Sequence, residues 1–155
     1  MSALDQMYQQ VILDHAKNPH GRGLVDAPAG DAVGESHQVN PTCGDEVTLR
    51  VAVADGTIDG VSWEGQGCSI SQASTSVMTE LVTGRTLAEV AELDGVFHRL
   101  MESRGKGLDN EEDEDLLGDA TAFTGTSQFP ARIKCALLGW AALKDSLARS
   151  GALAS

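Results

Sequence analysis

The sequence predicts an α+β fold in which a small three-stranded antiparallel sheet packs against helices. Apolar residues recur with a helical period near the start of the chain, then alternate as in strands, and then return to a helical period. The order helix, strands, helices is typical of α+β folds rather than of alternating α/β folds. The chain shows no internal repeat and no second boundary, so we expect one domain over residues 1–155.

The first predicted helix has apolar residues at i, i+3, i+4 and i+7, and it ends at Asn18-Pro19. Its expected apolar face consists of Leu4, Met7, Tyr8, Val11, Ile12 and His15. Residues 19–32 are rich in Gly, Pro, Ala and Asp, and they predict an irregular connection to the sheet.

Three strands are predicted next, over residues 33–40, 46–54 and 57–63. The second strand alternates well and places Val47, Leu49, Val51 and Val53 on one face. Asp55-Gly56 follows it and is a strong hairpin signal. The three strands therefore predict an antiparallel meander with helices on one side only.

The period of the apolar residues changes at Gly65-Gln66-Gly67, which we interpret as a tight turn. We predict a helix that starts at or just before Cys68, packs closely through its small residues, and ends at Gly84. Thr86 followed by Glu89 is a capping-box pattern and predicts the start of a third helical region.

This third helical region carries apolar residues as far as Met101 and is predicted to break at Asp94-Gly95. The acidic segment 109-DNEEDEDLLGD-119 is interpreted as a solvated excursion. Pro130 suits the first turn of a long last helix. The expected buried stripe of that helix is Ile133, Leu137, Trp140, Leu143 and Leu147.

Charge and hydropathy exclude several function classes. The net charge of −12 repels phosphate groups, so we do not expect nucleic acid as a partner. No apolar run approaches the roughly 20 residues of a membrane span. The first residues have neither the basic flank nor the apolar core of a signal peptide. We therefore expect a cytoplasmic protein with no membrane partner.

The three cysteines occupy settings that suit chemistry. Cys43 follows a proline-led turn and precedes Asp45 by two residues, so in extended backbone both side chains point the same way. Cys68 is expected at a helix start, where free N–H groups and the helix dipole favour a thiolate. Cys135 lies three residues after Arg132, whose guanidinium is expected to favour a thiolate as well.

Three thiolates and one carboxylate make an acceptable tetrahedral shell for Zn²⁺. The alternative is that the cysteines are independent, buried small side chains, because the chain has no C-x-x-C pair. Spacing alone leaves both interpretations open. The histidines add no signal, since His15 fits an ordinary helix position and His20 lies in a loop.

Three motifs nevertheless resemble the IscU/NifU-like family of iron–sulfur cluster assembly proteins. They are P-T-C-G-D at 41–45, G-Q-G-C-S-I-S at 65–71 and F-P-A-R-I-K-C-A at 129–136. The pattern of the opening helix, from Tyr8 to Gly23, is similar to the family as well, so the resemblance covers nearly the whole chain. It implies the same α+β fold.

Two details resemble the SufU-type branch of this family. Scaffold-type members carry a histidine just before the third cysteine, where this chain has Lys134. SufU-type members also carry an insertion between the second and third cysteine motifs, and the segment 105–120 looks like it. The loss of the histidine removes a possible ligand for an iron–sulfur cluster.

The resemblance implies a zinc site formed by Cys43, Asp45, Cys68 and Cys135. It also implies that Cys43 accepts persulfide sulfur from a SufS-type cysteine desulfurase, after a desulfurase histidine replaces its thiol at the zinc. Arg132 is expected to support the thiolate or the docking. Downstream iron–sulfur assembly proteins are the implied next partners. The alternative is a scaffold that holds iron or a [2Fe–2S] cluster on the same ligands.

Overall fold

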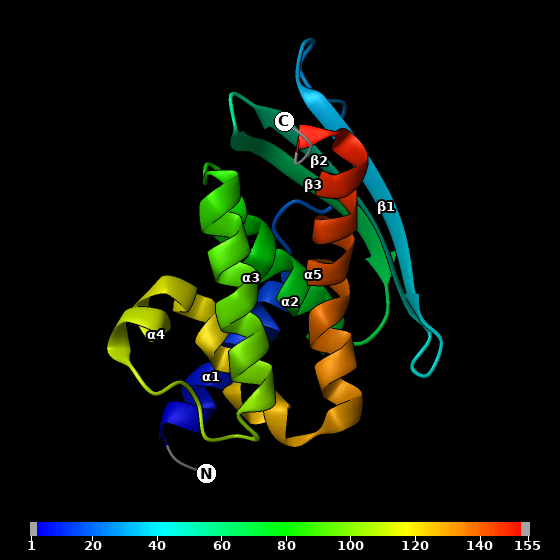
Figure 1. Ribbon diagram of the computed structural model, residues 1–155. Helices are drawn as coiled ribbons and strands as arrows, with labels where there is room; N and C mark the ends of the chain where they lie inside the picture. Colours follow the sequence, from blue (N-terminus) through cyan, green and yellow to red (C-terminus); the bar gives the residue numbers. More distant parts are fainter. Residues whose placement is uncertain (1–2, 153–155) are drawn as a thin grey trace.

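The computed structural model describes residues 3–152, and its elements follow the predicted order (Figure 1). They are α1 (Ala3–Lys17), β1 (Ala32–Asn40), β2 (Asp45–Ala54), β3 (Thr57–Gln66), α2 (Ser69–Val82), α3 (Leu87–Glu102), α4 (Glu111–Leu117), the 3₁₀ helix η1 (Gly118–Gln128) and α5 (Pro130–Ser150). The predicted fold class is confirmed, because the strands form an antiparallel sheet in the order β1-β2-β3. None of the helices within residues 3–152 combines the length and the hydropathy of a transmembrane segment.

Two hairpins build the sheet. Asp55 and Gly56 join β2 to β3 with φ values of 54° and 74°, the positive values that a type I′ turn requires. A four-residue loop, 41–44, joins β1 to β2 and leaves Asn40 opposite Asp45. This loop carries Cys43 to the end of the sheet, and Asp45 is the first residue of β2.

β3 is longer than the sequence predicts. It continues past Trp63 to Gln66, because Gly65 and Gln66 stay paired with Val47 and Glu46 of β2. The tight turn predicted at Gly65-Gln66-Gly67 is therefore wrong for its first two residues. Backbone pairing outweighed the weak strand propensity of glycine at this position.

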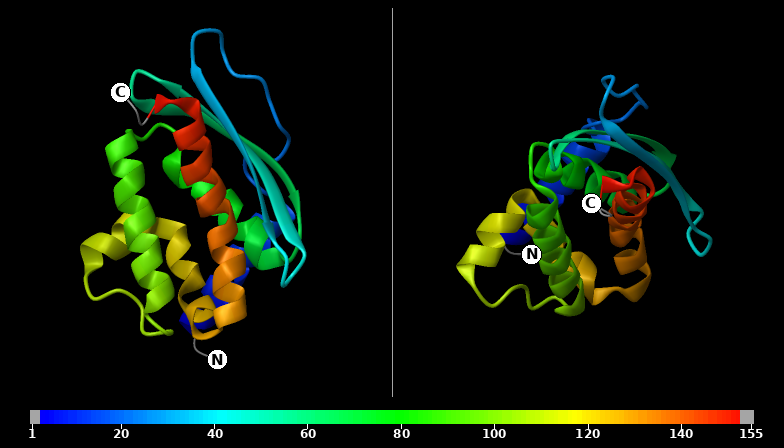
Figure 2. Two further views of the ribbon diagram at one scale, coloured as in Figure 1. Left: turned by 45° about the vertical axis from the view of Figure 1, so that its right-hand side comes forward. Right: turned by 45° about the horizontal axis from the view of Figure 1, so that its top comes forward.

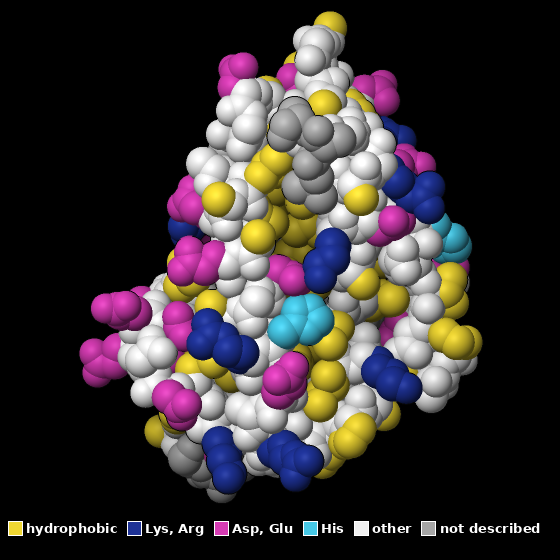
Figure 3. Space-filling model, viewed as in Figure 1, with side chains coloured by type: hydrophobic (Ala, Val, Ile, Leu, Met, Phe, Trp, Pro, Cys, Tyr) yellow, Lys and Arg dark blue, Asp and Glu magenta, His cyan; other side chains and the backbone are white. Residues whose placement is uncertain are grey.

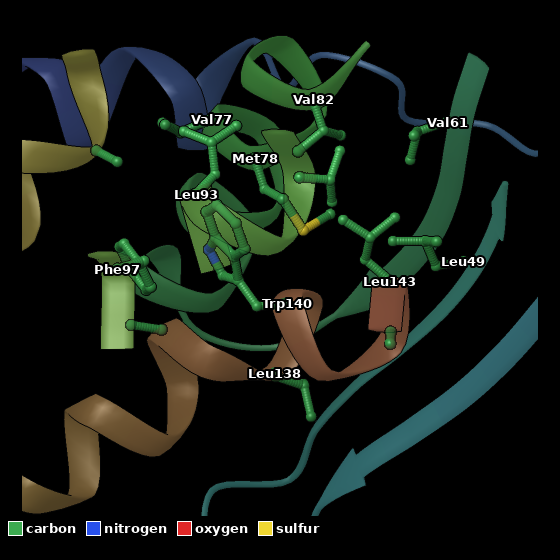
Figure 4. Close-up of a cluster of buried hydrophobic side chains, with 14 of the residues drawn as sticks. Leu49, Val61, Val77, Met78, Val82, Leu93, Phe97, Leu138, Trp140 and Leu143 are labelled. Carbon is green, nitrogen blue, oxygen red and sulfur yellow. The ribbon is translucent and has the colours of Figure 1, made fainter. Parts of the chain in front are cut away.

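The helices cover one face of the sheet (Figures 1 and 2). α5 lies along β1 and β2, α2 packs beside α5, and α1 packs against α2 and η1. The approach of α5 is close enough that a Cβ at Gly34 of β1 would overlap the backbone of Ser146. The buried apolar side chains form one cluster between the sheet and the helices (Figure 4). We propose on this basis that the chain folds as one domain.

α3 is continuous, so the break predicted at Asp94-Gly95 is wrong. Leu93, Val96 and Phe97 flank the glycine and are all buried in the core. A glycine inside a helix costs only about 1 kcal/mol relative to alanine, and burial of three large side chains exceeds that cost. The predicted capping box is present, since the Thr86 hydroxyl accepts from the backbone N–H of Glu89.

The acidic segment is more ordered than a solvated excursion. The side chain of Asn110 accepts from the backbone N–H of Asp113 and so begins α4. Acidic side chains gather around α4 on the face shown in Figure 3. The chain then returns to the core through Leu117 and Phe123, which are fully buried. The predicted exposure is confirmed for most of the acidic side chains, but it is wrong for the apolar residues that follow them, because these are buried.

Two terminal helices differ from their predicted apolar faces. Leu4 and Met7 of α1 are half exposed, and α1 contacts the core through Ile12 and Ala16 further along. In α5, Trp140, Leu143 and Leu147 are buried as predicted, whereas Ile133 and Leu137 are only partly buried. In both helices the apolar stripe extends beyond the part that packs against the core.

A hydrogen bond between β1 and α5 gives a testable pH dependence. The buried hydroxyl of Ser36 donates to Asp145 at 2.6 Å, and Arg149 donates to the same oxygen at 2.8 Å. The Ser36 hydrogen bond, and after it Arg149, hold the pKa of Asp145 below its ordinary value. A lowered folded-state pKa contributes stability above the unfolded pKa of about 4, and this contribution is lost as the pH falls through the folded pKa.

We therefore expect Ser36→Ala to lower the free energy of unfolding at pH 7, and the difference from the wild type to shrink below about pH 4. Urea denaturation of both proteins between pH 3 and pH 7 measures this. A difference that stays constant over that range would show that Ser36 acts by packing alone.

Candidate metal centre

Four predicted site residues lie where three elements meet. Cys43 is on the loop between β1 and β2, Asp45 begins β2, Cys68 is the N-cap residue of α2, and Cys135 lies in the second turn of α5. In Figure 1 this hairpin loop, the start of α2 and the first turns of α5 lie at the same end of the molecule. Residues from distant parts of the sequence therefore meet at one place.

The distances suit a single ion. One ligand atom each from Cys43, Asp45 and Cys135 lie within 4.8 Å of one another. The sulfur atoms of Cys43 and Cys135 are 3.4 Å apart and not bonded, and the Cys68 sulfur is 3.6 Å from Oδ2 of Asp45. Tetrahedral zinc at its usual bond lengths separates two sulfurs by about 3.8 Å, and a sulfur and an oxygen by about 3.5 Å. Cys43, Asp45 and Cys135 therefore fit zinc, whereas Cys68 lies outside this three-residue group and is held beside it by its contact with Asp45.

Asp45 organises the site from a fully buried position. Its Oδ1 accepts the backbone N–H of Cys68 at 2.8 Å, which holds the start of α2 against β2. Its Oδ2 faces the Cys68 thiol. A purely structural capping role would account for Oδ1, but the second oxygen lies among thiols, where a carboxylate suits a metal ion.

Gly67 leaves the room that Asp45 needs. Its φ is +149°, a value that residues with a side chain rarely adopt. A Cβ at this position would overlap the carboxyl group and the backbone of Asp45. The glycine next to Cys68 therefore has a steric function in the site, beyond its freedom to turn.

Cys135 is buried, and burial is the main reason why its pKa is raised well above the ordinary value of a thiol. Hydrogen bonds with Asp45, Cys43 and Cys68 raise it further. Arg132 is not among the groups that shift the pKa of Cys135, so its support of a thiolate stays a prediction. The Arg132 guanidinium lies instead 4.5 Å from the centroid of the Phe129 ring, and Arg132 is exposed. A metal ion is the group that would take the place of the Cys135 proton.

Asn40 is a further site residue that the sequence analysis did not identify. Its buried side chain extends an N–H toward the Cys135 sulfur, 3.9 Å away, and its Oδ1 accepts the backbone N–H of Thr42 at 3.3 Å. Its backbone carbonyl also accepts from Cys43 and Gly44. Asn40 thus fixes the loop and touches one thiol. The only sequence signal was an asparagine before a proline-led turn.

The α+β fold brings thiols and a buried carboxylate together at the end of its sheet, an arrangement typical of thiolate metal-binding domains. The chain belongs to the NifU-like N-terminal domain family, because the sequence model of that family matches residues 7–136. The family resemblance predicted from the three cysteine motifs is therefore confirmed.

Individual relatives cover nearly the whole chain. The chain is 40% identical to the zinc-dependent sulfurtransferase SufU of Bacillus subtilis, over 94% of this chain and 92% of that protein. It is 37% identical to the iron–sulfur cluster assembly scaffold protein IscU of Streptococcus pyogenes, over 97% and 88%. A crystal structure from Fervidobacterium islandicum, described as a putative iron–sulfur cluster assembly scaffold protein for the SUF system, has a TM-score of 0.73 at 35% identity. It covers 92% of this chain and 97% of its own.

Proposed function

We propose that this protein is a zinc-dependent sulfurtransferase that accepts persulfide sulfur from a SufS-type cysteine desulfurase and passes it to iron–sulfur cluster assembly in the cytoplasm. The observation that carries this proposal is the exposed thiol of Cys43 beside a buried thiol and a buried carboxylate. The name of the Bacillus subtilis relative supports the same reaction. Zn²⁺ held by Cys43, Asp45, Cys68 and Cys135 is the proposed cofactor.

The reaction is an exchange at sulfur. The Cys43 thiolate attacks the outer sulfur of the desulfurase persulfide, a new S–S bond forms on Cys43, and the S–S bond of the donor breaks. The donor cysteine leaves as a thiolate, so no outside oxidant or reductant is needed. Cys43 lies exposed on a loop, so a partner protein can reach its thiol.

The other site residues keep their places during this step. Asp45 holds the start of α2 by accepting the backbone N–H of Cys68. Asn40 holds the loop 41–44 by accepting the backbone N–H of Thr42. When bound, zinc supplies deprotonated thiols at neutral pH without redox chemistry of its own. Cys135 is buried and Cys68 is the N-cap residue of a helix, so Cys43 is the thiol that can move away with the least change in structure.

Arg132 is proposed to assist docking of the desulfurase. It is exposed, and its guanidinium stacks on the half-exposed ring of Phe129 at the start of α5. We expect Arg132→Ala to raise the KM for the desulfurase roughly fivefold with little change in kcat, because a charge at the rim of an interface affects mainly association. Lys134→Ala, two residues away and also exposed, is the matched control. A fall in kcat at unchanged KM would instead place Arg132 at the reacting thiol.

A scaffold for [2Fe–2S] assembly is the second candidate, favoured by the names of the Streptococcus and Fervidobacterium relatives. One pair of measurements separates the two functions. Metal analysis of the purified protein, with an assay of desulfurase turnover, is expected to give one zinc per chain and clear stimulation. Anaerobic reconstitution with iron and sulfide is expected to give no stable cluster, since Lys134 cannot supply an imidazole. A stable [2Fe–2S] spectrum without stimulation would favour the scaffold.

A further inference from the structure

Two histidines meet near the end of α1, away from the thiol site. His15 lies in the last turn of α1 and His20 in the loop that follows, with their ring centroids 5.2 Å apart. Glu80 of α2 lies beside them, 3.1 Å from Nε2 of His20. One ligand atom from each of the three residues lies within 4.8 Å of the other two. The fold thus brings together three side chains whose positions in the sequence gave no sign of a shared site.

His15 is held in a fixed orientation inside the protein. It is buried, its Nδ1 lies 2.8 Å from the hydroxyl of Ser76, and its Nε2 lies 3.4 Å from Oδ2 of Asp119. The Ser76 hydroxyl also accepts the backbone N–H of His20 at 2.8 Å. One serine of α2 therefore positions both histidines. Because Ser76 occupies Nδ1, Nε2 of His15 is the nitrogen that would turn from Asp119 to a bound ion, an arrangement common among metal-binding histidines.

The donor set selects the kind of ion. Two imidazole nitrogens and a carboxylate suit zinc and similar transition metals, whereas Ca²⁺ and Mg²⁺ prefer oxygen ligands alone. Two ligands at the usual Zn–N and Zn–O lengths lie about 3.3 Å apart in a tetrahedral shell. The ligand atoms here are separated by 3.1 Å to at most 4.8 Å, so small side-chain rotations would bring three ligands onto one ion and leave the fourth position of the tetrahedron to water. The carboxylate of Asp119 borders the site and adds negative charge.

We propose that His15, His20 and Glu80 form a second metal site, for a borderline divalent ion such as Zn²⁺, and that this ion fastens α1 to α2. Glu80 and Cys68 are twelve residues apart along α2, which corresponds to about 18 Å of helix. The two sites are therefore distinct. α1 packs only partly against the core, so a metal bridge to α2 would hold it in place.

The test starts from full-length protein that has been loaded with one equivalent of zinc, and it titrates further Zn²⁺ by calorimetry. We expect one further binding event for the wild type. His20→Ala and Glu80→Gln should each weaken that event at least tenfold while the first equivalent stays bound. Both side chains are more than half exposed, and the backbone N–H of His20 is retained, so neither change should unfold the protein.

His98→Ala is the matched control, because His98 is a partly exposed histidine with a carboxylate partner, Asp94 at 3.5 Å, but lies outside this three-residue group. It should bind the second zinc as the wild type does. Hydrogen exchange gives a second measurement, since amides of α1 should exchange more slowly after the second equivalent, except in His20→Ala. The proposal is wrong if no zinc-binding event of the wild type is weakened by His20→Ala and by Glu80→Gln. If the thiol site did not hold zinc, the first equivalent would bind at His15, His20 and Glu80, and that single event would depend on His20, so failure of the proposed function is distinguishable from failure of this proposal.

Discussion

Replacing Cys43 with alanine is expected to reduce sulfur transfer from a cysteine desulfurase at least about 100-fold, because the change removes the attacking thiol. Cys43 is exposed on a loop, and its thiol contacts one buried sulfur, that of Cys135. The free energy of unfolding should therefore change by less than about 0.5 kcal/mol in the metal-free state. Transfer is measured as radioactive or mass-labelled sulfur on the protein, together with desulfurase turnover.

Thr42→Ala is the control, since it changes an exposed neighbour in the same loop and should transfer sulfur normally. The assignment of Cys43 would be wrong if Cys43→Ala still accepted sulfur and stimulated the desulfurase. Loss of transfer in Cys68→Ala, with normal transfer in Cys43→Ala, would move the acceptor role to Cys68. That outcome is a real alternative, because the Cys68 thiol is exposed as well.

Gly67→Ala is expected to have the second large effect, on both stability and zinc binding. The backbone at Gly67 has a φ of +149°, and a residue with a side chain in such a region costs on the order of 1–3 kcal/mol. The new Cβ would also displace the carboxyl group of Asp45. We expect the free energy of unfolding to fall by about 2 kcal/mol or more, and the zinc affinity to fall at least about tenfold. Urea denaturation and competition with a zinc chelator measure the two effects.

Gly60→Ala of β3 provides the comparison, because a Cβ there meets no atom within 4 Å and its φ is not positive. It should change stability by less than about 1 kcal/mol and leave zinc affinity unchanged. If Gly67→Ala lost stability but kept full zinc affinity, Asp45 would be a structural cap of α2 and no ligand. The pair of variants thus separates backbone strain from the role of the carboxylate.

The parts of the fold that the sequence predicted well are those with strong local signals. Asp55-Gly56 adopts the positive φ values that its residue types favour, and Thr86 with Glu89 forms the expected capping box. The failures lie where local and tertiary preferences compete. Gly95 did not break α3, since its neighbours are buried on one side of the helix. Leu117 returned to the core from an acidic segment, which composition alone could not show.

The sequence by itself determined the chemical types at the proposed thiol site. Three cysteines at turns and helix starts, with Asp45 beside the first, suited a metal ion or a reactive thiol but left open independent, buried cysteines. The motif resemblance then selected among these, and the family comparison agrees with it. The motif resemblance and the family comparison both depend on the types and the order of the residues, which are read directly from the sequence.

Tertiary structure alone decided which thiols and imidazoles lie close together and how their surroundings shift a pKa. Cys43 and Cys135 are far apart in sequence, and only the packing of α5 against the sheet places their sulfurs 3.4 Å apart. The same packing buries Cys135, and this burial is the main reason why the pKa of its thiol is raised. His15 and Glu80 likewise carried no signal until α1 packed on α2. Contacts across the fold depend on how helices pack, and this packing determines the solvation of each thiol and imidazole.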